Sequence, residues 1–294
     1  MQGSSAHRAA EWRRCPTRGS SAPLGTVCSL CTRARTLSHV SSSEPPSTVR
    51  FSDRAADYAR YRPSYPPAAI DAILAGLAAP ESLTVADVGA GTGIFARLLA
   101  ERGARVLAVE PNAAMRDAAQ PHSRVEWSDG TGEATGLAPQ CCDLVTVAQA
   151  FHWFDQPIAL REFQRILRGG GRLAVVWNRR SRDDAFTLGY RHALEAIDGE
   201  APVERGEFDP TSVPRTGTFS GTRVLQFAFA HPLTADDLLG RALSTSTVPR
   251  EGPRTEKLLG ILRDLHARHA DPEGRAAMVY TTMVYLWDRV DPVR

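Results

Sequence analysis

The sequence has almost no lysine, no long apolar run and little net charge. Lys257 is the only lysine among 35 basic residues. Because arginine has GC-rich codons, this bias indicates a GC-rich genome and not a phosphate-binding surface. No stretch approaches the roughly 18 apolar residues that a membrane-spanning helix needs, and the net charge of +2 gives no reason to expect nucleic acid as a partner. We therefore expect a protein with neither a membrane nor a nucleic-acid partner.

Cysteine is also scarce, and its pattern builds neither a disulfide framework nor a zinc site. The five cysteines are an odd number, and no secretory pattern precedes them, which favours a reducing, cytoplasmic setting. Cys28 and Cys31 have C-x-x-C spacing, but a zinc site needs four ligands and the sequence contains no second such pair. We expect no bound metal.

Residues 1–47 differ from the rest of the chain. They are rich in serine, contain 6 Arg and only Glu11 and Glu44 as acids, and show no apolar period of 2 or 3.6. A disordered tail, an organelle transit peptide and an artefact of an upstream start codon are the three interpretations. We expect a disordered or non-native extension, followed by one domain at residues 48–294.

From about residue 50, short apolar runs alternate with helical patterns, which predicts a parallel sheet wrapped by helices. We expect strands at 83–88, 105–109, 125–127, 143–148 and 173–177. Helices are expected at 67–77 and 92–101, after Asn112, and from the cap Asp155 through Leu167, where the glycine run 169–171 should end the helix. Two later strands, at 224–229 and 279–287, are separated by helices near 234–243 and 254–269, and should pair antiparallel at the sheet edge.

Residues 86–94 form a glycine-rich loop between an expected strand and an expected helix, where open α/β sheets bind ligands. Its three alternating glycines allow a ligand close to the backbone, and the helix directs free N–H groups to the same place. No P-loop pattern is present, and the NAD pattern would need a small residue at Ile94. The loop alone leaves two alternatives, a nucleotide site and a tight strand–helix turn.

An acid at the end of the next strand favours the nucleotide site. Glu110 lies 21 residues after Gly89 and ends the apolar run 106–109. A carboxylate there can accept hydrogen bonds from both ribose hydroxyls of an adenosine. A surface acid would explain neither the spacing nor the run, so we predict an adenosine-containing ligand.

Residues 87–93 and 106–112 resemble the first motif and the following segment of the class I S-adenosylmethionine (SAM)-dependent methyltransferases. Residues 130–134 resemble the adenine loop of that family. Residues 51–66 and 148–155 resemble the subgroup that contains trans-aconitate methyltransferase-like proteins. The resemblance runs from about residue 50 to the C-terminus. It implies a Rossmann-like, doubly wound α/β sheet of seven strands with an antiparallel hairpin at one edge.

The resemblance also implies SAM as the cofactor and a set of residues that bind it. These are Asp87, Gly89, Ala90, Gly91, Gly93, Glu110, Pro111, Thr131, Gly132 and Gln149. In the wider family an Asp often stands at the position of Thr131 and binds the adenine amino group, so the hydroxyl here alters that contact. The Gly132 N–H can still meet an adenine nitrogen, and Gln149 would donate to the methionine part.

His152 is the candidate general base, because it follows the fourth strand and would face the cleft. Methyl transfer from a sulfonium mainly needs alignment and exclusion of water. A hydroxyl acceptor gains from a base, whereas a carboxylate needs none. The alternative is a structural histidine packed between Phe151 and Trp153. Arg62 is a candidate partner for an acidic substrate or for the cofactor carboxylate, and the alternative is an arginine that points into solvent.

These observations predict a cytoplasmic methyltransferase that transfers a methyl group from SAM to an unidentified small molecule, with acids among the candidates. A regulatory protein that binds SAM without turnover would contain the same loop and the same Glu110. An NAD(P)-dependent reductase is disfavoured by Ile94.

Overall fold

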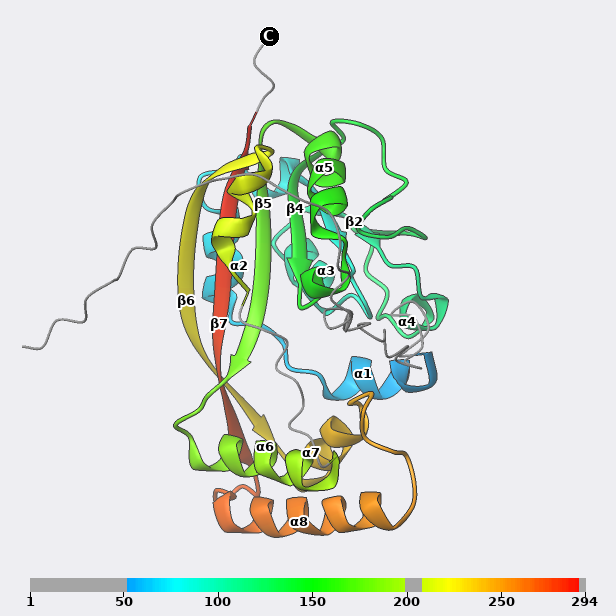
Figure 1. Cartoon of the computed structure of the whole chain (residues 1–294), viewed down its shortest axis with the longest axis vertical. Helices are drawn as coiled ribbons and strands as arrows, with labels where there is room; N and C mark the ends of the chain where they lie inside the picture. The colour runs from blue at the N-terminus through cyan, green and yellow to red at the C-terminus, as the bar shows by residue number, and fades with distance from the viewer. Residues whose placement is uncertain (1–51, 199–207, 291–294) are drawn as a thin grey trace, which may run out of the picture. The chain divides into compact units, whose positions relative to one another are not determined.

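A seven-stranded sheet organises the computed structural model, which describes residues 52–198 and 208–290 of the chain (Figure 1). The strands are β1 (Thr84–Val88), β2 (Arg105–Val109), β3 (Val125–Ser128), β4 (Cys142–Ala148), β5 (Leu167–Arg180), β6 (Phe219–Leu233) and β7 (Ala276–Arg289). Their order in the sheet is β3-β2-β1-β4-β5-β7-β6. The extension predicted at residues 1–47 lies outside the described residues.

The strands β1 to β5 are parallel where they pair, and β7 lies antiparallel between β5 and β6. This confirms the predicted α/β, Rossmann-like sheet with antiparallel strands at one edge. The strand order reverses between β1 and β4, because the chain moves from β1 outward to β3 and then returns. In such sheets the crevice at the carboxyl ends of the strands beside this reversal is the place where ligands bind.

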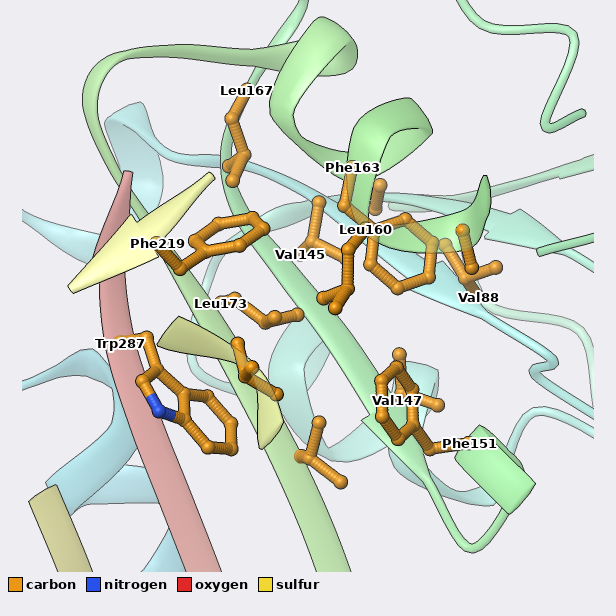
Figure 2. Close-up of a cluster of buried hydrophobic side chains, with 14 of the residues drawn as sticks. Val88, Val145, Val147, Phe151, Leu160, Phe163, Leu167, Leu173, Phe219 and Trp287 are labelled. Carbon is orange, nitrogen blue, oxygen red and sulfur yellow. The ribbon is translucent and has the colours of Figure 1, made fainter. Parts of the chain in front are cut away.

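Helices cover both faces of the sheet. They are α1 (Ala55–Tyr61), α2 (Pro67–Leu74), α3 (Ile94–Glu101), α4 (Ala113–Asp117), α5 (Gln156–Ile166), α6 (Ala185–Asp198), α7 (Ala235–Leu243) and α8 (Pro253–His269). Side chains alternate between the faces along β4: Leu144 packs with α2 and α3, whereas Val145 and Val147 pack with α5. Figure 2 shows the second of these layers, in which Leu160 and Phe163 of α5 cover the valines.

A third buried cluster explains why β5, β6 and β7 are longer than predicted. These strands continue past the parallel part of the sheet to reach α6, α7 and α8 (Figure 1). There Tyr190, Leu238, Leu258 and Met278, one from each helix and from β7, are buried against one another. No helix within the described ranges is long and apolar enough to span a membrane.

The helix predicted from Asp155 through Leu167 is present as α5, but the glycines at 169–171, expected to follow its end, lie inside β5. α5 ends at Ile166, and Leu167 already has an extended backbone. The glycines form an irregularity inside β5, between the strand pairs Cys142–Leu167 and Leu144–Arg172. Gly170 has a φ of 73°, which only glycine adopts easily. The glycines therefore form an irregular turn near the start of β5. Asp155 caps α5 as predicted, because its side chain accepts a hydrogen bond from the Ile158 N–H.

Candidate active site

A cavity of about 1080 Å³ opens at the carboxyl ends of β1, β2, β4 and β5. Asp87, Glu110, Gln149 and Asn178 mark those four strand ends, and all four line the cavity. The segment after α1 and the end of α7 complete its wall through Arg62 and other residues. The cavity therefore lies at the topological reversal, where the sequence predicts the ligand.

The three glycines of the first loop have different structural roles. Gly89, Gly91 and Gly93 have φ values of 70°, 57° and 75°. A Cβ on Gly89 would come within 2.6 Å of the Ala150 Cβ, and one on Gly93 within 2.9 Å of the Trp127 ring. Both glycines are thus required by packing inside the protein.

Gly91 is different, because a Cβ there would enter the cavity. Its nearest atoms would be Met115 Cε at 3.9 Å and a Tyr58 ring carbon at 4.0 Å. Gly91 lines the cavity, so its missing side chain leaves space for a ligand to approach the backbone. Of the three, Gly91 is the glycine whose missing side chain leaves open space in the cavity.

Glu110 fixes this loop and still faces the cavity. One carboxylate oxygen accepts from the Gly91 N–H at 2.9 Å and the other from the Asn112 N–H at 3.0 Å. Burial raises the pKa of Glu110 above its ordinary value, while these two hydrogen bonds oppose the shift. Each oxygen has a second lone pair, so the carboxylate can accept further hydrogen bonds from a ligand.

Asp87 presents a buried oxygen to the cavity. Its Oδ1 accepts from the Thr146 hydroxyl at 2.7 Å, whereas its Oδ2 has no hydrogen-bond partner among the described residues. Burial raises the pKa of the Asp87 carboxyl to about 7, and its interactions with the Thr146 hydroxyl and with the backbone of Ala96 oppose this. A buried oxygen without a partner is rare in folded proteins and points to a ligand that donates to it.

Gln149 and His152 follow β4 and also line the cavity. Gln149 has a φ of 59°, a strained value for a non-glycine residue, and its N–H donates to the Val176 carbonyl at 2.9 Å. The His152 ring lies beside two indoles, with centroids 4.7 Å from Trp153 and 5.2 Å from Trp177. The structure thus brings the candidate base into the cavity and places it against aromatic rings.

The predicted cofactor residues fall into two groups. Those that line the cavity are Asp87, Gly89, Ala90, Gly91, Glu110, Pro111 and Gln149. Gly93, Thr131 and Gly132 are not part of its lining. Thr131 closes a turn with Ala134, whose N–H donates to its hydroxyl at 3.2 Å. The Phe154 ring covers Gly132, where a Cβ would lie 2.6 Å from it. The roles of all ten residues stay predictions.

Comparison with known proteins assigns the chain to one family. Residues 86–175 match a family model described as a methyltransferase domain. An uncharacterized methyltransferase of Mycobacterium tuberculosis is 37% identical over 249 residues, which cover 81% of this chain and 95% of that relative. The chain belongs to the class I methyltransferases.

Solved structures agree with this methyltransferase assignment. A protein of Anaeromyxobacter dehalogenans described as a type II methyltransferase is similar with a TM-score of 0.56 and 27% identity, covering 79% of this chain and 100% of that one. A structure from Anabaena variabilis, described as a methyltransferase from an antibiotic biosynthesis pathway, has a TM-score of 0.53 and 24% identity, and covers 73% and 95% of the two chains. The second likeness bears on the fold alone.

The methyltransferase cavity also contains residues that sequence reasoning missed. Arg180 lies at the end of β5, Arg241 in α7 and Tyr280 in β7, and all three line the cavity. No local motif marks them. The capping box of Thr234 and Asp237 marks the start of α7, but it does not indicate which face of that helix meets the cavity.

Proposed function

We propose that this methyltransferase takes SAM as its methyl donor and transfers the methyl group to a small-molecule acceptor bound in the same cavity. The open space at Gly91, directly beside the Glu110 carboxylate, is the observation that carries the proposal. An adenosine whose ribose reaches Glu110 would need that space. The buried Asp87 Oδ2 offers a further acceptor for a donor group of the ligand.

When bound, SAM supplies an electrophilic methyl group: a lone pair of the acceptor forms the new bond, and the carbon–sulfur electron pair leaves with the sulfur of S-adenosylhomocysteine (SAH). The chain's own residues would align the acceptor and exclude water. Trp177 and Phe208 line the cavity and give it an apolar surface. A hydroxyl acceptor must also lose a proton, for which His152 is within the same cavity, whereas a carboxylate acceptor has no proton to lose.

A turnover screen tests this function. SAH release is measured with SAM and a panel of small acids, alcohols and phenols. Acceptor-dependent release supports the proposal. Tight binding of SAM with no turnover of any acceptor would favour the regulatory alternative, and binding of NAD in place of SAM would favour a reductase.

Asp87 should make the affinity for SAM depend on pH. Its pKa is raised by burial to about 7. Because SAM carries a net positive charge, the ionised carboxylate binds it better than the neutral acid does. We expect the affinity to rise about tenfold from pH 6 to pH 8, as measured by titration calorimetry. Asp87→Asn cannot ionise, so the dependence should disappear in that variant; an unchanged pH profile would exclude Asp87 as its source.

The raised pKa of Asp87 should also make the stability of the folded chain depend on pH. Asp87 keeps its proton up to about pH 7 in the folded chain but loses it near 3.8, its ordinary pKa, when unfolded. Its contribution to stability is therefore fully present below pH 3.8 and is lost as the pH rises through about 7. The melting temperature of Asp87→Asn relative to wild type should rise between about pH 5 and pH 8. A constant difference would contradict the shift.

We expect the packing role of His152 to outweigh a catalytic one. Its ring contacts Trp153 and Trp177, so His152→Ala should lower the free energy of unfolding by about 1–2 kcal/mol. Turnover should fall less than about tenfold, because general-base catalysis typically contributes about 100-fold or more. Chemical denaturation and kcat measure the two effects. A loss of about 100-fold in kcat with unchanged stability would instead make His152 the base.

A further inference from the structure

The outer edge of β6 is open along the described part of the chain. β6 stands last in the strand order and pairs only with β7, and Figure 1 shows it at the margin of the sheet. In an antiparallel pair every second residue directs its N–H and C=O away from the partner strand. A strand of 15 residues therefore presents a long row of backbone donors and acceptors that another strand can pair with.

Both ends of this edge are protected against pairing, but its middle is not. The pairing of β6 with β7 is irregular between Ser220 and Arg223, and Pro232, near the other end, has no N–H to donate. Irregularities, prolines and charges are the features with which proteins protect exposed edges. Residues 224–230 have the sequence VLQFAFA, which contains no charged residue and no proline. This uncharged middle indicates that another strand covers it.

The side chains of this stretch are left partly uncovered by their own chain. Leu225, Phe227 and Phe229 share one face of β6, because side chains alternate along a strand, and all three are only half-buried. The first two pack against the core beside α2, and Phe229 packs against the cluster of α6–α8. On the opposite face Val224 is 44% exposed. A strand added at this edge would cover both faces further.

A second copy of this chain fits the edge by symmetry. In a two-fold symmetric pair the same stretch serves both chains, so the paired stretch must end at equal distances from its centre. Arg223 follows the irregularity at one end, and His231 precedes Pro232 at the other. Phe227 lies midway between Arg223 and His231, which places the two-fold axis at Phe227.

This register gives matching side-chain pairs on both faces. Phe227 lies opposite Phe227 of the partner subunit, and Leu225 lies opposite the partner's Phe229. Aromatic and aliphatic pairs of this kind stabilise neighbouring antiparallel strands. On the other face Gln226 lies opposite the partner's Ala228, which is small and exposed in the single chain. The stretch is therefore complementary to itself.

No like charges meet in the same register. The charged side chain nearest to the centre is that of Arg223, which forms an ion pair with Asp288 of its own chain at 2.7 Å. Arg223 would lie opposite the partner's His231, whose ring in the single chain is half-buried and stacked on the Phe229 ring at 6.3 Å. Charge therefore does not oppose the pairing of two copies.

We propose that the chain forms a homodimer in which residues 223–231 of β6 pair antiparallel with the same residues of a second copy, so that the two sheets become one. Gln226 also lines the cavity, so the partner strand would run beside the cavity wall. A single pair of strands buries less than the roughly 1,200–2,000 Å² of a standard interface. We therefore expect a dissociation constant on the order of 10 μM.

Sedimentation velocity on the full chain, from about 1 to about 200 μM, tests the dimer. Ala228→Lys should weaken dimerisation about tenfold or more, because the two added lysines become diagonal neighbours across the axis. Ser220→Lys is the matched control. It adds the same charge to an exposed residue of β6 outside the paired stretch and should leave the dissociation constant within about threefold.

A double variant tests the register. Gln226→Glu combined with Ala228→Lys sets each new glutamate opposite a new lysine of the partner subunit, and opposite charges across a strand pair attract. Dimerisation should return to within about threefold of wild type. A double variant that dimerises no better than Ala228→Lys alone would contradict the proposed pairing.

Hydrogen exchange on the wild-type chain needs no variant and decides the matter if a substituted chain fails to fold. Exchange of the amides at 223–231 should slow as the concentration rises through the dissociation constant, while that of α8 stays unchanged. A chain that remains monomeric at about 200 μM, or a dimer that Ala228→Lys does not weaken, would overturn the proposal. Protection of these amides at every concentration in a monomer would mean that the same chain covers its own edge, which would overturn it as well.

Discussion

Gly91→Val should abolish measurable binding of SAM while the protein remains folded. The added side chain would enter the cavity beside the Glu110 carboxylate, where the nearest atoms to a new Cβ are 3.9 Å and 4.0 Å away. Such a Cβ displaces nothing inside the protein, so the loss falls on the ligand. Titration calorimetry with SAM and SAH measures the effect, and circular dichroism checks the fold.

Backbone strain needs its own control, because Gly91 has a φ of 57° and valine resists that region. Gly136→Val is suitable, since Gly136 has a φ of 73°, is exposed and does not line the cavity. A Cβ on Gly136 would have no atom of the described residues within 4 Å. This control should show a similar drop in melting temperature with unchanged SAM affinity. Wild-type affinity in Gly91→Val would mean that the loop is only a turn.

Glu110→Ala should weaken SAM binding about 10- to 100-fold. If Glu110 accepts from both ribose hydroxyls, the substitution removes two charge-assisted hydrogen bonds, each contributing about 1.5–3 kcal/mol. Partial replacement by water reduces the loss to the expected range. Titration calorimetry of SAH with wild type and variant measures the difference.

Glu110 has a second role that the experiment must separate from the first. Its carboxylate also accepts from the Gly91 and Asn112 N–H groups, so alanine could act by loosening the loop. A cofactor analogue without ribose hydroxyls distinguishes the two. The effect of Glu110→Ala should vanish for that analogue if the hydroxyl contacts carry it, and should persist if the loop carries it. Equal affinity of wild type and variant for SAM would refute the ribose assignment.

Much of the fold could be predicted because β1, β2 and β4 are short, largely buried apolar runs and because α7 and α8 have helical patterns of their own. The predicted strand at 105–109 coincides with β2, and the predicted helices near 234–243 and 254–269 with α7 and α8. The ends of β5, β6 and β7 could not be predicted, because they depend on α6–α8, against which these strands pack at long range. α1 was not predicted, since only Ala55 among its residues is buried and it shows no apolar period.

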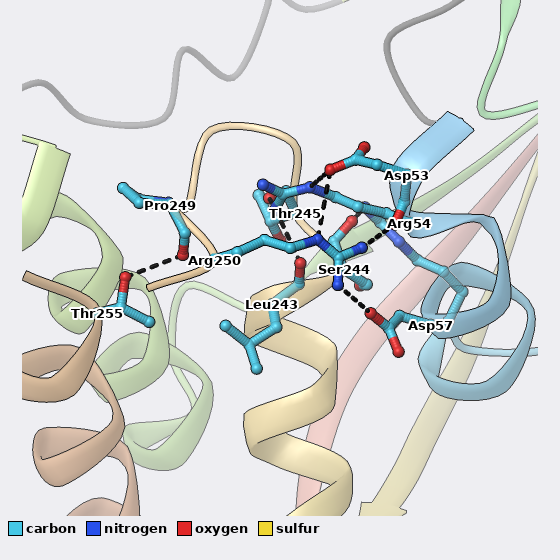
Figure 3. A network of polar contacts seen from close by, with 10 residues as sticks. Asp53, Arg54, Asp57, Leu243, Ser244, Thr245, Pro249, Arg250 and Thr255 are labelled. Atoms are coloured by element: carbon cyan, nitrogen blue, oxygen red, sulfur yellow. Dashed lines mark hydrogen bonds and ion pairs between the residues drawn. The ribbon is translucent and has the colours of Figure 1, made fainter. Parts of the chain in front are cut away.

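The candidate site likewise contains some residues that could be predicted from the sequence and others that could not. Asp87, Gly91 and Glu110 lie in local motifs whose spacing carries the information, and the structure brings them together at the cavity. Arg180 and Arg241 lie in no motif. Arg241 belongs to α7, which is held against α1 by long-range contacts: Arg54 donates to the Leu243 carbonyl (Figure 3), and Gly240 packs against the Tyr61 ring. Sequence reasoning could name Arg62 as a candidate for an acidic partner, but not the two arginines that join it.

Titration of the wild-type chain with SAM and, separately, with NAD is the most direct test of the central claim that this cavity binds SAM. We predict one SAM site per chain with a Kd on the order of micromolar, and no measurable binding of NAD. Binding of NAD without binding of SAM would contradict the claim.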